Sequence, residues 1–267
     1  MTHPYQRSRF FRDTLPDAHV SEHGNIRSLH LGTPTIQSSM NIDNPAELVL
    51  SYSRAMMGWL LFANEMPQHA LHIGLGGGSF VRWLHNKLPK MRQTAIEINP
   101  QVIHIARTSF MLPPENGQFE IIQADGAEYV KILRSSTDLI LADGFDGVQI
   151  IEALTTSAFF ADCRTALSPN GIFATNWWRG DKRYPQFVQK LKQEFAGRVL
   201  EIPAESHGNM AVLAFQAAPK TLQLDKLKKH AEQLSAQYHL DFRRLFADAK
   251  ANNPHNGKTF YFQAATL

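Results

Sequence analysis

The sequence has a single cysteine and little net charge, and these shortages exclude several kinds of protein. Cys163 alone permits neither an intrachain disulfide nor a zinc site built from cysteines. The 27 basic and 24 acidic side chains leave a formal net charge of +3, and no dominant basic run or repeat indicates nucleic acid. The 12 histidines show no metal-ligand spacing. We therefore expect neither a metal site nor a nucleic-acid partner.

Long hydrophobic runs are also missing. The longest, residues 55–63, is far too short to cross a bilayer. Residues 1–15 are polar and charged and lack the apolar region of a signal peptide. We therefore expect a cytoplasmic protein with no membrane partner. With 43% hydrophobic residues, the chain still has enough apolar side chains for a sizeable core.

A glycine-rich stretch is the most informative feature that is present. A short apolar run from Leu71 leads into Gly74, Gly76, Gly77 and Gly78. Glycine lets a backbone turn sharply and approach a ligand, and the helical pattern that begins at Ser79 supplies free N–H groups and a positive dipole end. Nineteen residues after Gly78, a second apolar run reaches Glu97, whose carboxylate suits the hydroxyls of a ribose. A glycine turn also serves plain helix packing, but this spacing favours a nucleoside site.

Strand-like and helix-like patterns alternate through the middle of the chain. The expected strands are residues 70–74, 94–98, 119–123, 139–142 and 172–176. Helical patterns separate them at residues 79–88, 100–110, 127–134 and 151–167. This alternation predicts a parallel sheet covered on both faces. A further helix at residues 184–195 and two closing strands at 198–202 and 211–215 complete the pattern. We predict an α/β protein with the Rossmann-like, seven-stranded fold of S-adenosylmethionine-dependent methyltransferases.

The chain divides into three predicted segments. Residues 1–66 contain a polar arm up to residue 24, a small β-hairpin or meander, and a helix that opens at Asn44-Pro45. Residues 67–218 form the nucleoside-binding core. Residues 219–267 contain a charged helical stretch with a solvated face, followed by a tail that is either a short strand or disordered.

Acidic residues follow the strands of the predicted sheet. Ligands of such sheets lie outside the carboxyl ends of the strands, where this sequence places Glu97, Asp125, Asp143 and Asp146. Asp125 either caps the following helix or binds the amino group of adenine. The paired acids of the Asp143–Asp146 turn suit a cationic substrate such as a sulfonium or an alkylamine. A buried carboxylate there is able to take the proton that an amine must lose before it attacks.

Taken together, these motifs resemble those of the spermidine/spermine synthases, the polyamine aminopropyltransferases, over about residues 29–215. The glycine turn with Glu97-Ile98-Asn99 resembles the nucleoside site of that family, and Asp125-Gly126 resembles its adenine-contacting pair. Asp143-Gly144-Phe145-Asp146 resembles its turn of two acids, in which the second is the catalytic base. Two more matches come from the first segment, where Gln37 resembles a glutamine after the β-hairpins and Tyr52 an active-site tyrosine.

The resemblance implies transfer of an aminopropyl group from decarboxylated S-adenosylmethionine to putrescine or a related small amine. Methylthioadenosine is then the product, and no metal or permanently bound cofactor takes part. The implied catalytic residues are Asp146 as base, Asp143 and Tyr52. The implied donor-binding residues are Gln37, Gly74, Gly76, Gly77, Gly78, Ser79, Glu97, Ile98, Asp125, Gly126 and Asp143. The sequence leaves open whether the chain forms a homodimer.

The departures from the family pattern fall on the amine side. Ser79 stands where the family has an acid that recognises the aminopropyl amine, Arg54 where it has a glutamate, and Gly147 where a proline is usual. Residues 205–208, Glu-Ser-His-Gly, replace a Tyr-Pro-Ser-Gly-like segment. Two other functions therefore remain open: a methyltransferase that uses intact S-adenosylmethionine with another acceptor, and a non-catalytic nucleoside-binding protein. Ser79 either selects the donor or only caps its helix, in which case Glu205 is the candidate partner of the donor's ammonium.

Overall fold

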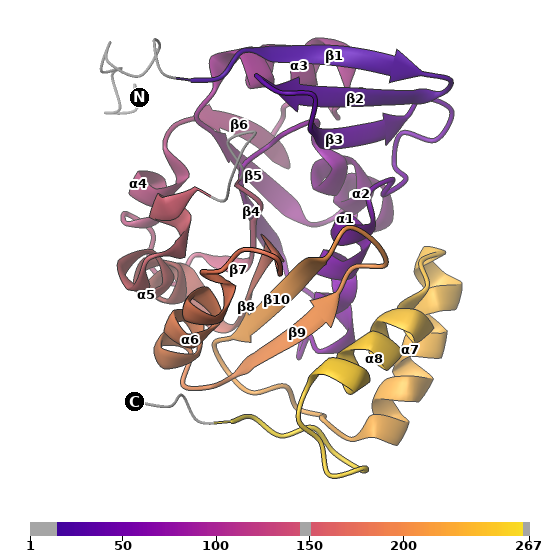
Figure 1. The fold of residues 1–267 in the computed structure, drawn as a ribbon, viewed down its shortest axis with the longest axis vertical. Helices are drawn as coiled ribbons and strands as arrows, with labels where there is room; N and C mark the ends of the chain where they lie inside the picture. The colour runs from indigo at the N-terminus through magenta and orange to yellow at the C-terminus, as the bar shows by residue number, and fades with distance from the viewer. Residues whose placement is uncertain (1–14, 145–150, 264–267) are drawn as a thin grey trace.

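The centre of the protein is a seven-stranded sheet (Figure 1) in a computed structural model that describes residues 15–144 and 151–263. The strand order is β6-β5-β4-β7-β8-β10-β9, with parallel pairing from β6 to β8 and antiparallel pairing for the last two pairs. The strands are β4 (His69–Ile73), β5 (Arg92–Glu97), β6 (Phe119–Gln123), β7 (Thr137–Ala142), β8 (Leu167–Trp178), β9 (Val199–Pro203) and β10 (Asn209–Phe215). All seven predicted strands and the predicted fold class are confirmed.

Helices cover both faces of this sheet (Figure 1). One face carries α1 (Ser51–Met56), the 3-10 helix η2 (Met57–Leu61), α2 (Ser79–Lys87), α3 (Pro100–Ser109), α7 (Leu224–Tyr238) and α8 (Phe242–Asn252). The other face carries α4 (Gly126–Val130), α5 (Ser157–Ala166) and α6 (Tyr184–Glu194), with the short 3-10 helix η3 (Glu152–Thr155) before α5. Helix α4 ends earlier than the predicted residue 134, and the predicted helix at 151–167 is divided into η3 and α5.

The sheet joins two hydrophobic cores because successive side chains of a strand point to opposite faces. In β7, Leu139 and Leu141 pack toward α1, α7 and α8, whereas Ile140 and Ala142 pack toward α4, α5 and α6. Cys163 of α5 is fully buried in the second core, as its apolar surroundings in the sequence predict.

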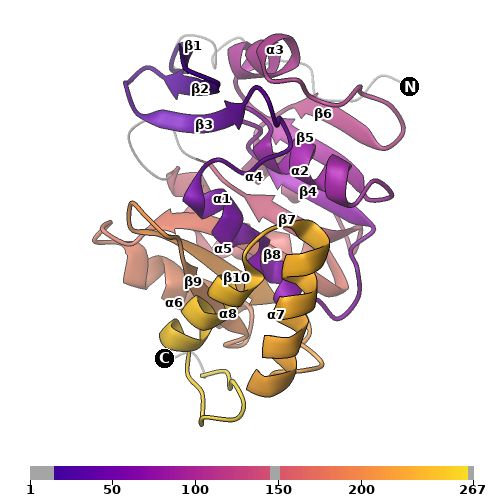
Figure 2. The ribbon, with the colours of Figure 1, turned by 90° about the vertical axis from the view of Figure 1, so that its right-hand side faces the viewer.

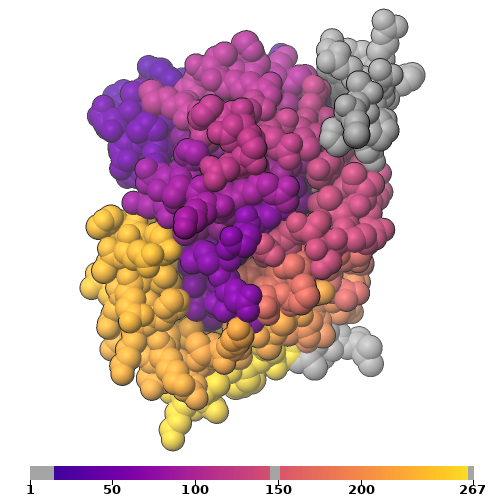
Figure 3. Space-filling model, turned by 180° about the vertical axis from the view of Figure 1, so that it is seen from behind, coloured from indigo at the N-terminus to yellow at the C-terminus, as the bar shows by residue number. Residues whose placement is uncertain are grey.

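A second, three-stranded antiparallel sheet lies at the opposite end of the molecule from α7 and α8 (Figures 2 and 3). It consists of β1 (Ala18–His23), β2 (Ile26–Leu31) and β3 (Ile36–Asn41). The prediction of an irregular arm up to residue 24 is wrong for β1, because backbone pairing with β2 orders a strand whose side chains stay largely exposed. The helix predicted from Asn44 begins only at Ser51. The carbonyls of the intervening loop bind arginine side chains instead of helical N–H groups.

The C-terminal segment is a pair of helices and not one continuous helix. The chain turns at His239, which adopts a left-handed conformation with φ 55° between α7 and α8. The inner side chains Leu227, Ala231 and Phe242 share a core with η2. Beyond α8, Thr259 bridges to Gln223, and Phe260 is buried. No helix within residues 15–144 and 151–263 combines the length and apolar character needed to cross a membrane.

Candidate active site

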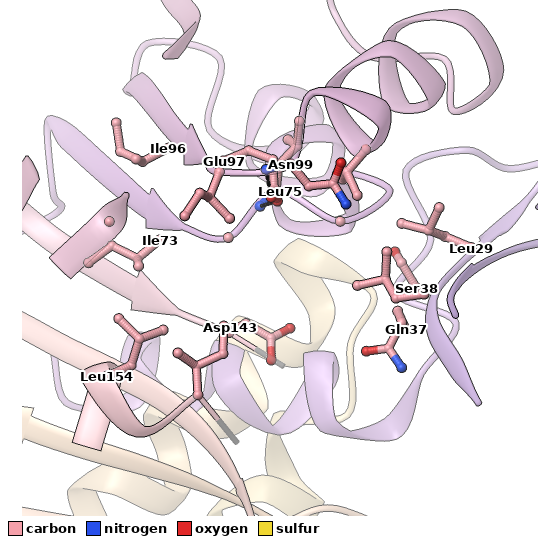
Figure 4. Close-up of a pocket in the computed structure, with 18 of the residues that line it drawn as sticks. Leu29, Gln37, Ser38, Ile73, Leu75, Ile96, Glu97, Asn99, Asp143 and Leu154 are labelled. Carbon is pink, nitrogen blue, oxygen red and sulfur yellow. Dashed lines mark hydrogen bonds between the residues drawn. The ribbon is translucent and has the colours of Figure 1, made fainter. Parts of the chain in front are cut away.

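A cavity lies at the carboxyl ends of the parallel strands, beside the N-terminal sheet (Figure 4). The predicted site residues that line it are Gln37, Tyr52, Gly74, Gly76, Ser79, Glu97, Ile98, Asp125, Gly126 and Asp143. Gly77 and Gly78 belong to the same turn but are not among the lining residues. The predicted base, Asp146, and its neighbour Gly147 lie outside the residues that the structure describes.

The glycine turn brings the ends of β4 and β7 together. Gly74 has φ 91°, and a Cβ atom there would collide with the carbonyl oxygen of Asp143. Only glycine tolerates both the positive φ and this close approach. Behind the turn, a side chain on Gly77 would meet the ring of Phe110. The turn is therefore packed tightly on its outer side and open to the cavity on its inner side.

Glu97 is buried at the end of β5 and accepts hydrogen bonds from the turn. Its Oε2 accepts from the backbone N–H of Leu75 at 3.0 Å, and its Oε1 accepts from that of Asn99 at 2.9 Å. Burial raises the pKa of this carboxyl, and the backbone N–H groups act in the opposite direction. A carboxylate oxygen accepts more than one hydrogen bond. Glu97 therefore keeps capacity for ribose hydroxyls while it holds the turn in place.

The sequence left two roles open for Asp125, a helix cap and a contact with adenine, and the structure shows the first of them. Its Oδ1 caps α4 by accepting from the backbone N–H groups of Ala127 at 2.8 Å and Glu128 at 3.4 Å. The same residue lines the cavity together with Gly126. The helix cap is confirmed, and the contact with adenine stays a prediction.

Asp143, at the end of β7, receives hydrogen bonds from two other elements. The Nδ2 of Asn176 donates to its Oδ1 at 3.3 Å, and Asn209 in turn donates to Asn176 at 2.9 Å. The Tyr52 hydroxyl is shared between two acceptors, since it donates to the carbonyl oxygen of Gln37 at 3.2 Å and also interacts with Asp143. Burial raises the pKa of Asp143, although both side-chain donors lower it. The sequence analysis missed Asn176, whose only signal was a polar residue at the end of the apolar strand β8.

Ser79 does not cap its helix. Gly78 occupies the N-cap of α2, and the Ser79 hydroxyl instead donates to the carbonyl of Ser39 at 3.3 Å and lies 3.2 Å from the Ser38 hydroxyl. The capping explanation for Ser79 is therefore wrong. Ser38, which the sequence analysis also missed, lines the cavity and connects the glycine turn to β3.

Glu205 lies away from the cavity that holds Glu97 and Asp143. Its Oε2 accepts from Arg54 Nη2 at 3.1 Å, and Arg54 Nη1 also donates to the carbonyls of Leu48 and Val49. Arg54 and Glu205 line a separate depression together with Asp241. The two departures from the family pattern thus form one ion pair, which argues against Glu205 as a substitute carboxylate for the donor.

Comparisons with known proteins identify related sequences and a related fold. The sequence profile of the spermine/spermidine synthase domain matches residues 49–199. A polyamine aminopropyltransferase of Neisseria meningitidis serogroup A is 63% identical over 259 residues, which cover 97% of this chain and 98% of the relative. One from Chromobacterium violaceum is 55% identical over 252 residues, covering 94% and 96%. The crystal structure of a probable spermidine synthase from Corynebacterium glutamicum shares the fold, with a TM-score of 0.66 and 17% identity over 80% of this chain and 83% of that one. The chain belongs to the spermidine/spermine synthase family.

Proposed function

We propose that the protein transfers the aminopropyl group of decarboxylated S-adenosylmethionine to a small amine such as putrescine. The observation that carries this proposal is the position of two carboxylates on one cavity, Glu97 on the side of the glycine turn and Asp143 across from it (Figure 4). In this proposal Glu97 binds the nucleoside of the donor, and Asp143 faces the cationic centre. Membership in a family of aminopropyltransferases supports the same reaction class.

The reaction needs mainly correct placement of its two substrates. The amine nitrogen attacks the aminopropyl carbon next to the sulfonium. A C–N bond forms while the C–S bond breaks, and sulfur keeps the electron pair as methylthioadenosine leaves. An alkylamine is protonated at neutral pH, so the nitrogen must lose a proton before it attacks. In this proposal Glu97 holds the ribose, Asp143 and Tyr52 orient the amine, and Asp146 takes the proton.

Purified protein incubated with putrescine and one donor at a time tests the proposal. Mass spectrometry should find spermidine and methylthioadenosine with the decarboxylated donor. A methylated product from intact S-adenosylmethionine would instead identify a methyltransferase. Methylthioadenosine binding without any product from either donor would indicate a non-catalytic nucleoside-binding protein.

Two substitutions test the participation of the paired acids. Asp146→Asn should lower turnover by roughly 10²–10⁴-fold if this residue is the base, while methylthioadenosine still binds. Asp143→Asn should also impair turnover, because it removes the charge that faces the amine. Glu232→Gln on the exposed side of α7 is the matched control and should behave like the parent. Full turnover in the Asp146→Asn variant would place the base elsewhere.

A further inference from the structure

Arg82 is a buried cation directly behind the glycine turn. It lies in the first two turns of α2 with only 4% of its surface exposed. Its Nε donates to the carbonyl of Pro45 at 2.6 Å, and its Nη1 donates to the carbonyls of Phe110 at 3.0 Å and of Gly77. One side chain thus joins the loop before α1, the end of α3 and the glycine turn.

Burial of an arginine without an ionic partner is unusual. Within residues 15–144 and 151–263, Arg82 forms no ion pair, and its Nη2 has no hydrogen-bond partner. Burial lowers its pKa to about 10, so the guanidinium is still charged at neutral pH. A buried cation without a carboxylate is costly, and the nearby N-terminus of α2 is the positive end of that helix. The charge is compensated by the three carbonyl dipoles and by the ring of Phe110, whose centroid lies 6.0 Å from the guanidinium carbon.

The bond to Gly77 has a direct consequence for the cavity. Because a peptide unit is planar, fixing the Gly77 carbonyl also fixes the N–H group of Gly78. That N–H donates to the Leu75 carbonyl at 2.8 Å and closes the turn. Gly77 and Gly78 are consequently held on the outer side, whereas Gly74, Leu75, Gly76 and Ser79 face the cavity.

We infer that Arg82 is a positioning residue that holds the glycine turn in the conformation that binds the nucleoside of the donor. The inference rests on the proposed function in that it takes this cavity as the donor site. Arg82 contacts no substrate in this account. It acts through three backbone carbonyls, and its loss should therefore affect donor binding more than the chemical step.

Calorimetry with methylthioadenosine tests the inference in the absence of any acceptor. Arg82→Met keeps the aliphatic stem and removes all three donated bonds, so its affinity for methylthioadenosine should fall at least about tenfold. Arg82→Lys keeps the charge but reaches fewer carbonyls at once, and it should show a smaller loss. Arg164→Met, on the exposed side of α5, is the matched control with parental affinity. In turnover assays, KM for the donor should rise with kcat nearly unchanged.

The outcomes are distinct. Parental affinity in folded Arg82→Met would overturn the inference, even if its melting temperature had dropped, because Arg82 would then only stabilise the fold. Should Arg82→Met not fold, parental affinity and KM in Arg82→Lys would overturn it equally. A parent protein that does not bind methylthioadenosine would remove the proposed function, and the inference with it.

Discussion

The Glu97 carboxylate has two roles, since it anchors the backbone of the glycine turn and lines the cavity proposed to bind the nucleoside. Glu97→Gln keeps the shape of the side chain but replaces one acceptor oxygen by a donor. We expect methylthioadenosine to bind more weakly by about 1–3 kcal/mol, because buried hydrogen-bonding groups lose their partners. Titration calorimetry of the variant measures this loss. Glu120→Gln on the neighbouring strand β6 is the control, and equal affinities in all three proteins would remove Glu97 from the site.

The hydrogen bond from Tyr52 links the pH dependence of activity to α1. Burial raises the pKa of Asp143, and the Tyr52 hydroxyl opposes this rise by stabilising the ionised form. An ionised Asp143 is needed to face a cationic amine, so activity should increase as pH rises through this pKa. Tyr52→Phe removes the stabilising donor, raises the pKa further and should move the acid limb of the kcat/KM profile to higher pH. Exposed Tyr261→Phe should leave the limb in place. A shift to lower pH in Tyr52→Phe would contradict this assignment.

Ser79 faces the cavity at the position where the family pattern predicts an acid. The decarboxylated donor ends in a bare ammonium, whereas intact S-adenosylmethionine also carries a carboxylate that an acid would repel. Ser79→Asp should therefore strengthen the preference for the decarboxylated donor by about 1.5–3 kcal/mol, the value of a hydrogen bond to a charged group. Competition binding of both donors measures this preference, with Ser79→Asn as the uncharged control. Unchanged relative affinities would exclude Ser79 from donor selection.

At the scale of elements, the tip of the β9–β10 hairpin is tied to the start of α1. Arg54 pairs with Glu205, and the hydroxyls of Ser51 and Ser206 lie 2.9 Å apart. The ion pair is partly exposed, so Glu205→Ala should cost at most about 1 kcal/mol of unfolding free energy. Turnover should stay close to that of the parent. Arg54→Ala should cost more, because the carbonyls of Leu48 and Val49 also lose a donor. Urea unfolding and turnover assays compare the two variants, and a large loss of turnover in Glu205→Ala would restore it as a substrate-binding acid.

The elements that local pattern determines were predictable, and those that depend on distant contacts were not. Apolar strands, the glycine turn and the acids at the ends of β5, β6 and β7 are local signals, and the structure places Glu97, Asp125 and Asp143 on one cavity. The formation of strand β1 depends on its pairing with β2. Helix α1 starts late because arginine side chains donate hydrogen bonds to the carbonyls of the preceding loop. Nothing in the spacing of residues reveals such partners, because the side chain of Arg82 joins segments that are far apart in sequence.

At the scale of the whole molecule, the hydrophobic core extends further along the chain than the match to the family profile. The profile match ends at residue 199, before β10, α7 and α8. Yet the apolar side chains of α7 and α8 pack in one cluster with η2, β7 and β8. Helix α8 also contacts β9 through Asn253, whose side chain exchanges hydrogen bonds with the backbone of Glu201. The C-terminal helices are therefore expected to unfold together with the sheet.

Substitution in α8 tests this coupling. Phe242 is fully buried and packs against the ring of Tyr238, with centroids 6.3 Å apart. Phe242→Ala should lower the unfolding free energy of the whole protein by about 3–5 kcal/mol, because a cavity replaces the ring. Urea unfolding followed by both fluorescence and circular dichroism should show one shared transition, while the folded variant binds methylthioadenosine normally. Ile132→Ala, with a side chain 56% exposed, should change stability by less than about 0.5 kcal/mol. Two separate transitions, with only the first shifted by Phe242→Ala, would show that α7 and α8 unfold independently of the seven-stranded sheet.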